Sequence, residues 1–184
     1  GLGLLPELKQ LALEHIGRVE KSVVSFGQGC EGDPLMAADV IEPAIRLIRS
    51  KTDKGTINLN TNAGHTDNLR KLINAGLDSI RVSLNSSRKK CYETYFRPVS
   101  YKFHNVLNSI DIAAEHGLFV SVNYLNIPGI TDSPDEFDSF QRFLDNHAVN
   151  YIQWRNMNFD PLRYWKLLND ATRHGKPLGI ANII

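Results

Sequence analysis

Short β-rich runs alternate with amphipathic helical patterns along the chain, and this alternation constrains the fold more than any other feature. Between the runs, apolar residues recur at helical spacing, as from Phe103 to Ala114. Strands that alternate with helices about 30 residues apart favour βα repeats and a parallel sheet. The chain is therefore predicted to be α/β, with one domain over residues 1–184. The predicted strands are 22–26, 56–61, 78–84, 118–125 and 149–155.

Proline and short polar residues predict where three of the helices begin. Pro43 suits the first turn of a helix, because its missing N–H has no intrahelical partner there. Thr66 is predicted to cap the next helix. Ser133 and Glu136 have the spacing of a capping box, and the neighbouring acids favour a helix N-terminus.

Four successive strands have one apolar and one polar face. Because side chains alternate along a strand, the polar side chains gather on one side of the sheet. A doubly wound sheet has continuous apolar strands, and a closed eight-stranded barrel is filled mostly with Val, Ile and Leu. A wide or incomplete barrel with a polar lumen fits better, and a sheet with one solvent-facing side is the alternative. The polar residues are Asn58, Asn60, Asn62, Arg81, Ser83, Asn85, Ser121, Asn123, Gln153 and Arg155.

Composition excludes several classes of protein. Lys and Arg number 21 against 20 Asp and Glu, so bulk positive charge does not favour nucleic-acid binding. No apolar run approaches the roughly 18 residues of a membrane span, and no signal-like segment opens the sequence. The two cysteines, Cys30 and Cys91, lie too far apart for a zinc or cluster motif. A cytoplasmic protein without a membrane partner is expected.

A glycine-rich loop follows the first predicted strand. Gly27, Gly29 and Gly32 precede the pair Asp33-Pro34. Glycines at the carboxyl end of a strand let backbone groups approach a ligand closely, at the edge where parallel sheets place active sites. The spacing is not GxGxxG and the loop lacks a P-loop lysine, so a nucleotide-phosphate cradle is not predicted. A tight turn that needs glycine explains the loop equally well.

Five segments resemble, in order, motifs of the radical S-adenosylmethionine (radical SAM) superfamily. GCEGDPL (29–35) resembles its GGEP motif, INLNTNAG (57–64) its TNG strand end, and SIRVSLNS (79–86) its SLDG strand end. YFRPVSYKFHNVLNSI (95–110) resembles the stretch that follows, and NIPGITDSPDEF (126–137) the PG.ND loop and its helix. The similarity covers about residues 22–155, and the order of the motifs is more specific than any one of them.

The resemblance implies a partial, TIM-barrel-like (β/α) barrel that binds S-adenosylmethionine (SAM) across the carboxyl edge of its strands. The glycine loop is implied to hold the methionyl amino group, although Asp33 is shorter than the family's glutamate. Ser83 and Asn85 match positions that contact the ribose or carboxylate, Asn62 matches the TNG strand end, and Asn123 lies near positions that contact the ribose or adenine. The implied cofactor-binding residues are Gly29, Cys30, Glu31, Gly32, Asp33, Asn62, Ser83, Asn85, Arg97 and Asn123. Arg155 is added to them because it is expected to point into the polar lumen, where a guanidinium needs an anionic partner.

One departure from the family concerns the iron–sulfur cluster. Family members hold a [4Fe–4S] cluster on a CxxxCxxC loop after the first strand, and this chain has no such triad. Cys30 lies in the glycine loop and Cys91 in a helical stretch, so no metal ligand or catalytic residue is predicted here. We expect the family's first strand and cluster loop to lie upstream of Gly1, which makes this chain an inactive fragment. A relative that has lost its cluster is the alternative.

For the full-length parent, the resemblance implies a radical enzyme of the oxidoreductase or activating type. An electron donor such as flavodoxin or ferredoxin reduces the cluster, which cleaves SAM to methionine and a 5′-deoxyadenosyl radical that takes hydrogen from a substrate the sequence does not reveal. A cluster-free half-barrel that binds a ligand or serves as a scaffold remains the alternative. An unrelated barrel enzyme would need paired carboxylates or metal ligands at strand ends, and the sequence offers none there.

Overall fold

The computed structural model describes residues 5–27, 32–156, 160–172 and 174–183. Five parallel strands form one sheet in the order of the sequence, from β1 to β5. Each strand pairs with the next along the chain, so β1 and β5 are the two edges and the barrel is not closed. The predicted partial α/β barrel with parallel strands is confirmed. The strands are β1 (Val23–Phe26), β2 (Thr56–Thr61), β3 (Ser79–Leu84), β4 (Phe119–Asn126) and β5 (Tyr151–Asn156).

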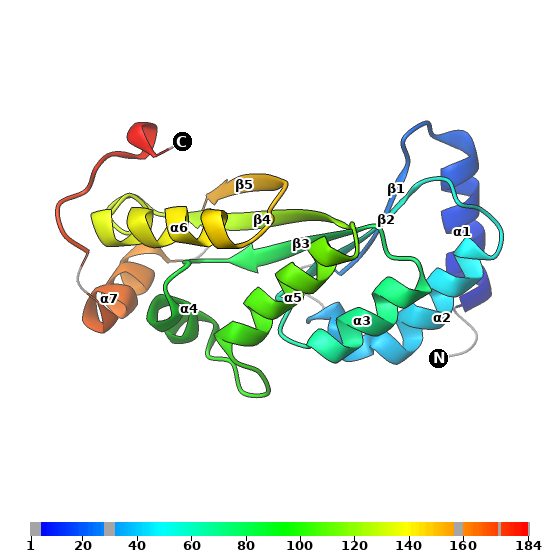
Figure 1. Cartoon of the computed structure of the whole chain (residues 1–184), viewed down its shortest axis with the longest axis horizontal. Helices are drawn as coiled ribbons and strands as arrows, with labels where there is room; N and C mark the ends of the chain where they lie inside the picture. The colour runs from blue at the N-terminus through cyan, green and yellow to red at the C-terminus, as the bar shows by residue number, and fades with distance from the viewer. Residues whose placement is uncertain (1–4, 28–31, 157–159, 173, 184) are drawn as a thin grey trace.

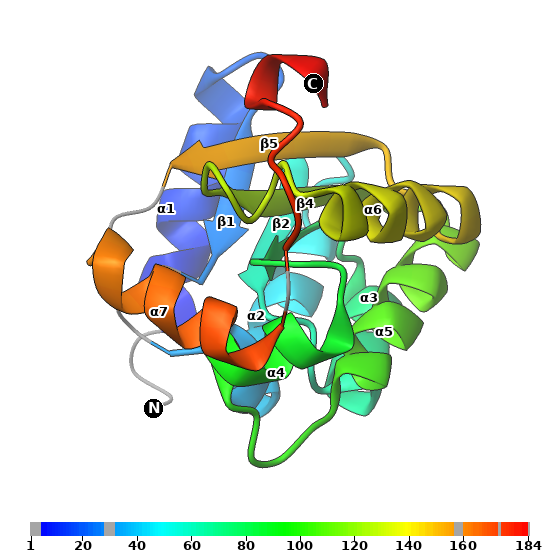
Figure 2. The same cartoon turned by 90° about the vertical axis from the view of Figure 1, so that its left-hand side faces the viewer.

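Helices surround the apolar face of this sheet. In Figure 1, α2, α3 and α5 lie beside one another along the sheet, and the arrowhead of β3 points to the end of the molecule where α4 and α7 lie. Figure 2 views the molecule from that end, with α4 and α7 side by side. None of the helices in the described ranges is long and apolar enough to cross a membrane. The helices are α1 (Leu5–Arg18), α2 (Ala38–Arg49), α3 (Thr66–Ala75), α4 (Lys89–Phe96), α5 (Phe103–Glu115), α6 (Pro134–Asn146) and α7 (Pro161–Ala171), with 3₁₀ turns η1 (Pro34–Ala37) and η2 (Ile180–Asn182).

The predicted alternation of apolar and polar side chains is confirmed by the packing. Ile57, Ile80 and Val122 are fully buried and pack into one core with apolar residues of α2, α3 and α5. On the same side, Trp154 contacts Tyr124 and the ring of a phenylalanine on α6. The register keeps the polar residues of neighbouring strands side by side, because each strand pair is in phase. One face of the sheet therefore supplies the core and the other is left for a ligand.

Two of the predicted helix starts are wrong. Helix α2 begins at Ala38 rather than at Pro43, because η1 already sets the chain on a helical path. Pro43 lies inside α2 and removes the N–H that would bond to the carbonyl of Asp39. Thr66 does not cap α3: its hydroxyl contacts the carbonyl oxygen of Asn105 at 3.2 Å and the Ser109 hydroxyl at 2.9 Å, which joins α3 to α5.

The loop after β1 passes so close to β2 that its first residue must be glycine. Gly27 has a φ of +88°, and a Cβ added there would lie 2.4 Å from the carbonyl oxygen of Asn60. The Asn60 side-chain amide donates to the Gly27 carbonyl at 2.9 Å, which fixes the approach. The glycine thus has a packing reason as well as a conformational one.

We predict that Gly27→Ala lowers the free energy of unfolding by about 3 kcal/mol or more, because the methyl group adds a backbone clash to the strain of positive φ. Gly117→Ala is the matched control: Gly117 has a φ of +76° with nothing within 4 Å of an added Cβ. It should cost only about 1–2 kcal/mol. Urea unfolding of both variants measures the difference, and equal costs would contradict the close approach.

Candidate functional site

Two adjoining cavities open where the strands end. One, of roughly 680 Å³, lies at the ends of β3, β4 and β5, and another, of roughly 500 Å³, at the ends of β1, β2 and β3. Four residues line both cavities, so the two form a continuous hollow that we call the strand-end cavity. The shared residues are Ser83, Phe96, Asn123 and Arg155.

The structure brings most of the sequence-predicted site residues together around this cavity. Arg97 does not line it and lies instead in a separate hollow between α4 and α7. Gly29, Cys30 and Glu31 lie outside the described residues. The predicted residues that line the strand-end cavity are Gly32, Asp33, Asn62, Ser83, Asn85, Asn123 and Arg155.

Asp33 joins the glycine loop to the end of β2. Its carboxylate accepts hydrogen bonds from the Thr61 hydroxyl at 2.9 Å, the Asn62 N–H at 2.5 Å and the Leu35 N–H at 2.9 Å. A carboxylate that accepts this many hydrogen bonds is held in one orientation. The Asp33 side chain therefore fixes the end of the loop against β2.

A second turn forms at the end of β2. The Thr61 hydroxyl accepts from the N–H of Ala63, which has a φ of +57°, and the Asn62 side-chain oxygen accepts from the N–H of Gly64, each at 2.9 Å. Gly64 packs so closely on Tyr101 that an added Cβ would lie 2.4 Å from the ring. The TNAG segment is thus held on both sides at the rim of the cavity.

The lower part of the polar face is satisfied internally. The Asn58 amide donates to the Ser25 hydroxyl at 3.2 Å and to the Asn60 side-chain oxygen at 3.1 Å, and the Ser79 hydroxyl donates to Asn58 at 2.9 Å. Ser121 donates to the carbonyl of Ile80 at 3.2 Å. These side chains support the sheet and leave the upper part of the face to bind a ligand.

Higher on the same face, buried acceptors lack a partner among the described residues. They are the side-chain oxygens of Asn123 and Gln153, which lie opposite one another in the β4–β5 register, and of Asn85 at the end of β3. Leaving a buried acceptor unpaired costs about 1–3 kcal/mol. A bound molecule that carries O–H or N–H groups would satisfy them. Sequence reasoning placed Gln153 on the polar face but did not assign it to the site.

Asn85 also ties the cavity to α7. Its side-chain amide donates to the Tyr164 hydroxyl at 3.0 Å and to the Cys91 carbonyl at 3.2 Å. Tyr164 is fully buried, and this burial raises the pKa of its hydroxyl well above the usual range, so it stays protonated. The hydrogen bond therefore places α7 beside the mouth of the strand-end cavity.

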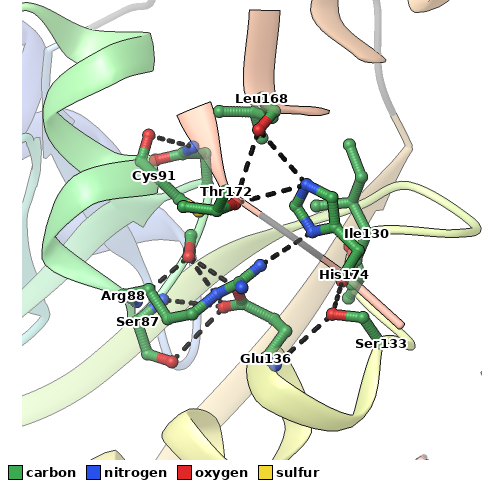
Figure 3. A network of polar contacts seen from close by, with 12 residues as sticks. Ser87, Arg88, Cys91, Ile130, Ser133, Glu136, Leu168, Thr172 and His174 are labelled. Atoms are coloured by element: carbon green, nitrogen blue, oxygen red, sulfur yellow. Dashed lines mark hydrogen bonds and ion pairs between the residues drawn. The ribbon is translucent and has the colours of Figure 1, made fainter. Parts of the chain in front are cut away.

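A buried carboxylate, Glu136, organises the loop after β3. It accepts from the Ser86 hydroxyl at 2.6 Å, the Ser87 N–H at 2.9 Å and the Arg88 Nε at 2.7 Å, and also from the Tyr124 hydroxyl. Figure 3 shows the contacts of Ser87 and Arg88 converging on the Glu136 side chain. Burial, strengthened by the adjacent carboxylate, holds the pKa of the Tyr124 hydroxyl well above its usual range.

The sequence predicts that the Glu136 side chain caps α6, and this prediction is wrong. Ser133 does cap α6, accepting from the Glu136 N–H at 3.4 Å, but the Glu136 side chain points away from the cap to Arg88. Because the capping-box spacing explains the glutamate by itself, the sequence holds no signal for the buried ion pair. Only the fold brings the two charges together.

The same network fastens the segment after α7. Arg88 Nη2 lies 3.0 Å from His174 Nδ1, and His174 Nε2 lies 3.2 Å from the Leu168 carbonyl (Figure 3). Since a carbonyl only accepts, Nε2 carries the proton and Nδ1 accepts from Arg88. Burial, followed by the positive charge of Arg88, lowers the pKa of His174. The ring is thus held neutral.

Comparison with known proteins identifies the family to which this geometry belongs. The family model described as the radical SAM superfamily matches residues 4–144, most of the chain. The chain belongs to the radical SAM superfamily. No curated protein sequence matches it significantly.

Solved structures of radical SAM proteins have the same fold. A domain of pyruvate-formate lyase-activating enzyme from Bacteroides vulgatus has a TM-score of 0.57 at 12% identity, over 82% of this chain and 94% of that one. HydG, a maturase of the [FeFe]-hydrogenase, gives 0.60 at 18% identity, over 89% of this chain and 40% of that one. Coproporphyrinogen III oxidase (HemN) from Escherichia coli gives 0.61 at 13% identity, over 98% and 42%. This radical SAM chain thus spans less than half the length of the last two.

The radical SAM family implies two cofactors, and the described residues fit only one of them. The unpaired acceptors, the glycine loop and Arg155 suit a ligand with hydroxyl, amino and carboxylate groups, as SAM has. In the described ranges, no group of three or more His, Cys, Asp or Glu residues is placed to hold a metal. Cys91 is fully buried, with its sulfur 3.4 Å from the Thr172 hydroxyl. The described residues therefore do not fit a [4Fe–4S] cluster.

We predict that Asp33→Asn lowers the free energy of unfolding by about 2 kcal/mol, because an amide NH₂ replaces an oxygen that accepts from Thr61 and Asn62. Amide hydrogen exchange at Asn62 should also speed up, which locates the change at the cavity rim. Asp53→Asn, an exposed position in the loop before β2, is the control and should change stability by less than about 0.5 kcal/mol. Equal urea midpoints for the two variants would contradict the role given to Asp33.

We predict that His174 makes the chain less stable in mild acid. The pKa of His174 is about 6.5 in the unfolded chain and lower in the folded chain, so below pH 6.5 the unfolded state binds more protons. The free energy of unfolding therefore decreases as the pH is lowered. The extra slope is at most about 1.4 kcal/mol per pH unit. His174→Gln should be less stable at pH 8 and lack this slope between pH 7 and 5 in urea titrations. A wild-type slope no steeper than that of the variant would show that the ring is not held neutral.

Proposed function

We propose that this chain is the SAM-binding core of a radical SAM enzyme. The observation that supports this most directly is the pair of buried acceptors on Asn123, which lines the strand-end cavity, and on Gln153, its partner in the β4–β5 register. These oxygens have no partner within the described ranges, and the ribose hydroxyls or adenine amino group of SAM would supply donors.

The other cofactor contacts follow from position. We assign the backbone of residues 29–33 to the methionyl amino group, because Asp33 holds the end of that loop against β2. Arg155, which lines both halves of the strand-end cavity, is assigned to the carboxylate. Ser83 and Asn62 complete the polar lining. Arg97 lies in a different hollow, so we assign it to a different ligand below.

The cluster ligands are proposed to come from residues outside this sequence, upstream of Gly1. In the parent protein, the electron supplied through that cluster by a donor such as flavodoxin or ferredoxin would cleave SAM to methionine and a 5′-deoxyadenosyl radical, in a cytoplasmic oxidoreductase or activating-type enzyme. The part played by this chain is to bind SAM, orient it and exclude water. Without the cluster we propose that the chain binds SAM weakly and is inactive.

SAM binding by the 184-residue chain tests this proposal. We predict that Gln153→Met lowers SAM affinity about tenfold in calorimetric or NMR titrations, because the donor of the ligand loses its acceptor. The same variant should be at least as stable as the wild type, because the buried unpaired oxygen is gone. Gln141→Met, the same substitution at an exposed position on α6, is the matched control and should leave both properties unchanged.

The outcome also separates the two candidate functions. Absence of SAM binding in the wild type would overturn the proposal and favour the cluster-free binding or scaffold module. SAM binding that Gln153→Met does not alter would overturn the assignment of the β4–β5 acceptors. In the parent protein, 5′-deoxyadenosine formation under reducing conditions would then test whether the SAM site serves radical chemistry.

A further inference from the structure

A third cavity, of roughly 540 Å³, lies between the last turn of α4 and one face of α7. Three of its lining side chains are cationic and one, Asp170, is acidic, so its charge is predominantly positive. We infer that this basic cavity, lined by Arg97, Arg163 and Lys166, binds an oxyanion group, a carboxylate or phosphate, of the molecule on which the parent enzyme acts. Its assignment to the substrate rests on the proposed function.

The backbone of Arg97 carries the first part of the argument. Arg97 ends α4 in the left-handed region, with φ 46° and ψ 54°, and its N–H donates to the Glu93 carbonyl at 3.0 Å. Glycine adopts this helix-ending conformation without strain, whereas another residue pays about 1–2 kcal/mol. An arginine where the backbone favours glycine indicates that its side chain has a use. Strain of this kind gathers at ligand sites.

Helix α7 supplies the opposing cations from a fixed position. Arg163, Lys166 and Asp170 recur at three- and four-residue spacing and so share a face. Elsewhere on the helix, Tyr164 and Leu168 are fully buried. The hydrogen bond from Asn85 to Tyr164 and the network around His174 hold the helix in place. The cationic residues of α4 and α7 therefore line opposite sides of one cavity, and the position of α7 is fixed by the fold.

The basic cavity adjoins the strand-end cavity. Tyr95 lines both, and its ring lies edge-on to those of Tyr164 and Phe96, at 5.0 and 4.9 Å between centroids. Burial raises the pKa of the Tyr95 hydroxyl, so this shared wall is uncharged. A molecule can therefore place its anionic end among the cations while another part reaches past Tyr95 toward the SAM site.

The residue types suit oxyanions over halide ions. The arginine guanidinium is always charged and donates two parallel hydrogen bonds to a carboxylate or phosphate, and the lysine adds a point charge. Because these side chains are exposed, each contact is worth little by itself and the affinity for a free anion should be modest. Selectivity for phosphate or acetate over chloride is thus the expected signature.

The test is a titration of the full 184-residue chain with inorganic phosphate, acetate and chloride at constant ionic strength, followed by the backbone amide signals of Arg97 and Lys166. We expect saturable shifts with phosphate, acetate or both, and none with chloride. Arg97→Gly should weaken binding at least threefold while leaving the urea midpoint unchanged or raised, because glycine relieves the positive φ. If Arg97 served only to end the helix, Arg97→Gly would raise the urea midpoint and leave the anion affinity unchanged.

Lys166, which is exposed on α7, provides a second variant. Lys166→Gln should also weaken anion binding at least threefold. Lys54→Gln is the matched control, because Lys54 is exposed in the loop that enters the other end of β2. Equal responses to phosphate, acetate and chloride, or unchanged affinity in both Arg97→Gly and Lys166→Gln, would overturn the inference.

The same titrations distinguish this inference from the proposed function. Anion binding needs neither SAM nor a cluster, and we expect SAM binding to be lowered by Gln153→Met and not by Lys166→Gln. If phosphate or acetate binds selectively and SAM does not bind at all, the oxyanion site stands but its assignment to a radical SAM substrate is overturned. If SAM binds and no oxyanion is selected, the SAM site stands and the oxyanion site is overturned.

Discussion

Burial on one side of the sheet is the constraint on which the rest of this structure depends. Ile57, Ile80 and Val122 point to the helices and leave water completely, so their polar neighbours along each strand must point the other way. A slip of one residue in any strand pair would exchange the two faces and expose the core. The hydrophobic effect thus fixes the positions of Ser83 and Asn123 as firmly as it fixes the core.

Two carboxylates then hold the irregular segments in which the site is formed. Asp33 ties the glycine loop to β2, and Glu136 ties the loop after β3 to β4, α6 and, through Arg88, the segment that follows α7. Loops have no ladder of hydrogen bonds of their own, so their geometry depends on such cross-links. Each carboxylate accepts hydrogen bonds from several donors, which offset the free-energy cost of removing its charge from water.

The sequence predicts the sheet, its order along the chain and its two faces, because period-two patterns in Ile57–Asn62 and Ser79–Asn85 specify which side is buried. Most of the residues that it assigns to the cofactor line the strand-end cavity. It could not predict the ion pair of Arg88 with Glu136, since these residues are 48 positions apart and the capping-box spacing explains Glu136 by itself. Nor could it show that Arg97 and Arg155 line different cavities, because this depends on the left-handed backbone at the end of α4, which turns Arg97 toward α7.

In the proposed site, the oxygens of Asn123 and Gln153, which have no partner among the described residues, would also set which ligands the cavity accepts. Their desolvation is already complete in the folded chain, so a ligand with donors there gains hydrogen bonds without a further desolvation cost on the protein side. An apolar group in the same place would leave both acceptors without a partner and would gain none of these hydrogen bonds. Sites of this kind discriminate more sharply against the analogue that lacks a donor than a hydrophobic pocket can against an extra methylene. The proposed site therefore selects a ligand by the hydrogen bonds that its donors gain, and this selectivity is set when the chain folds.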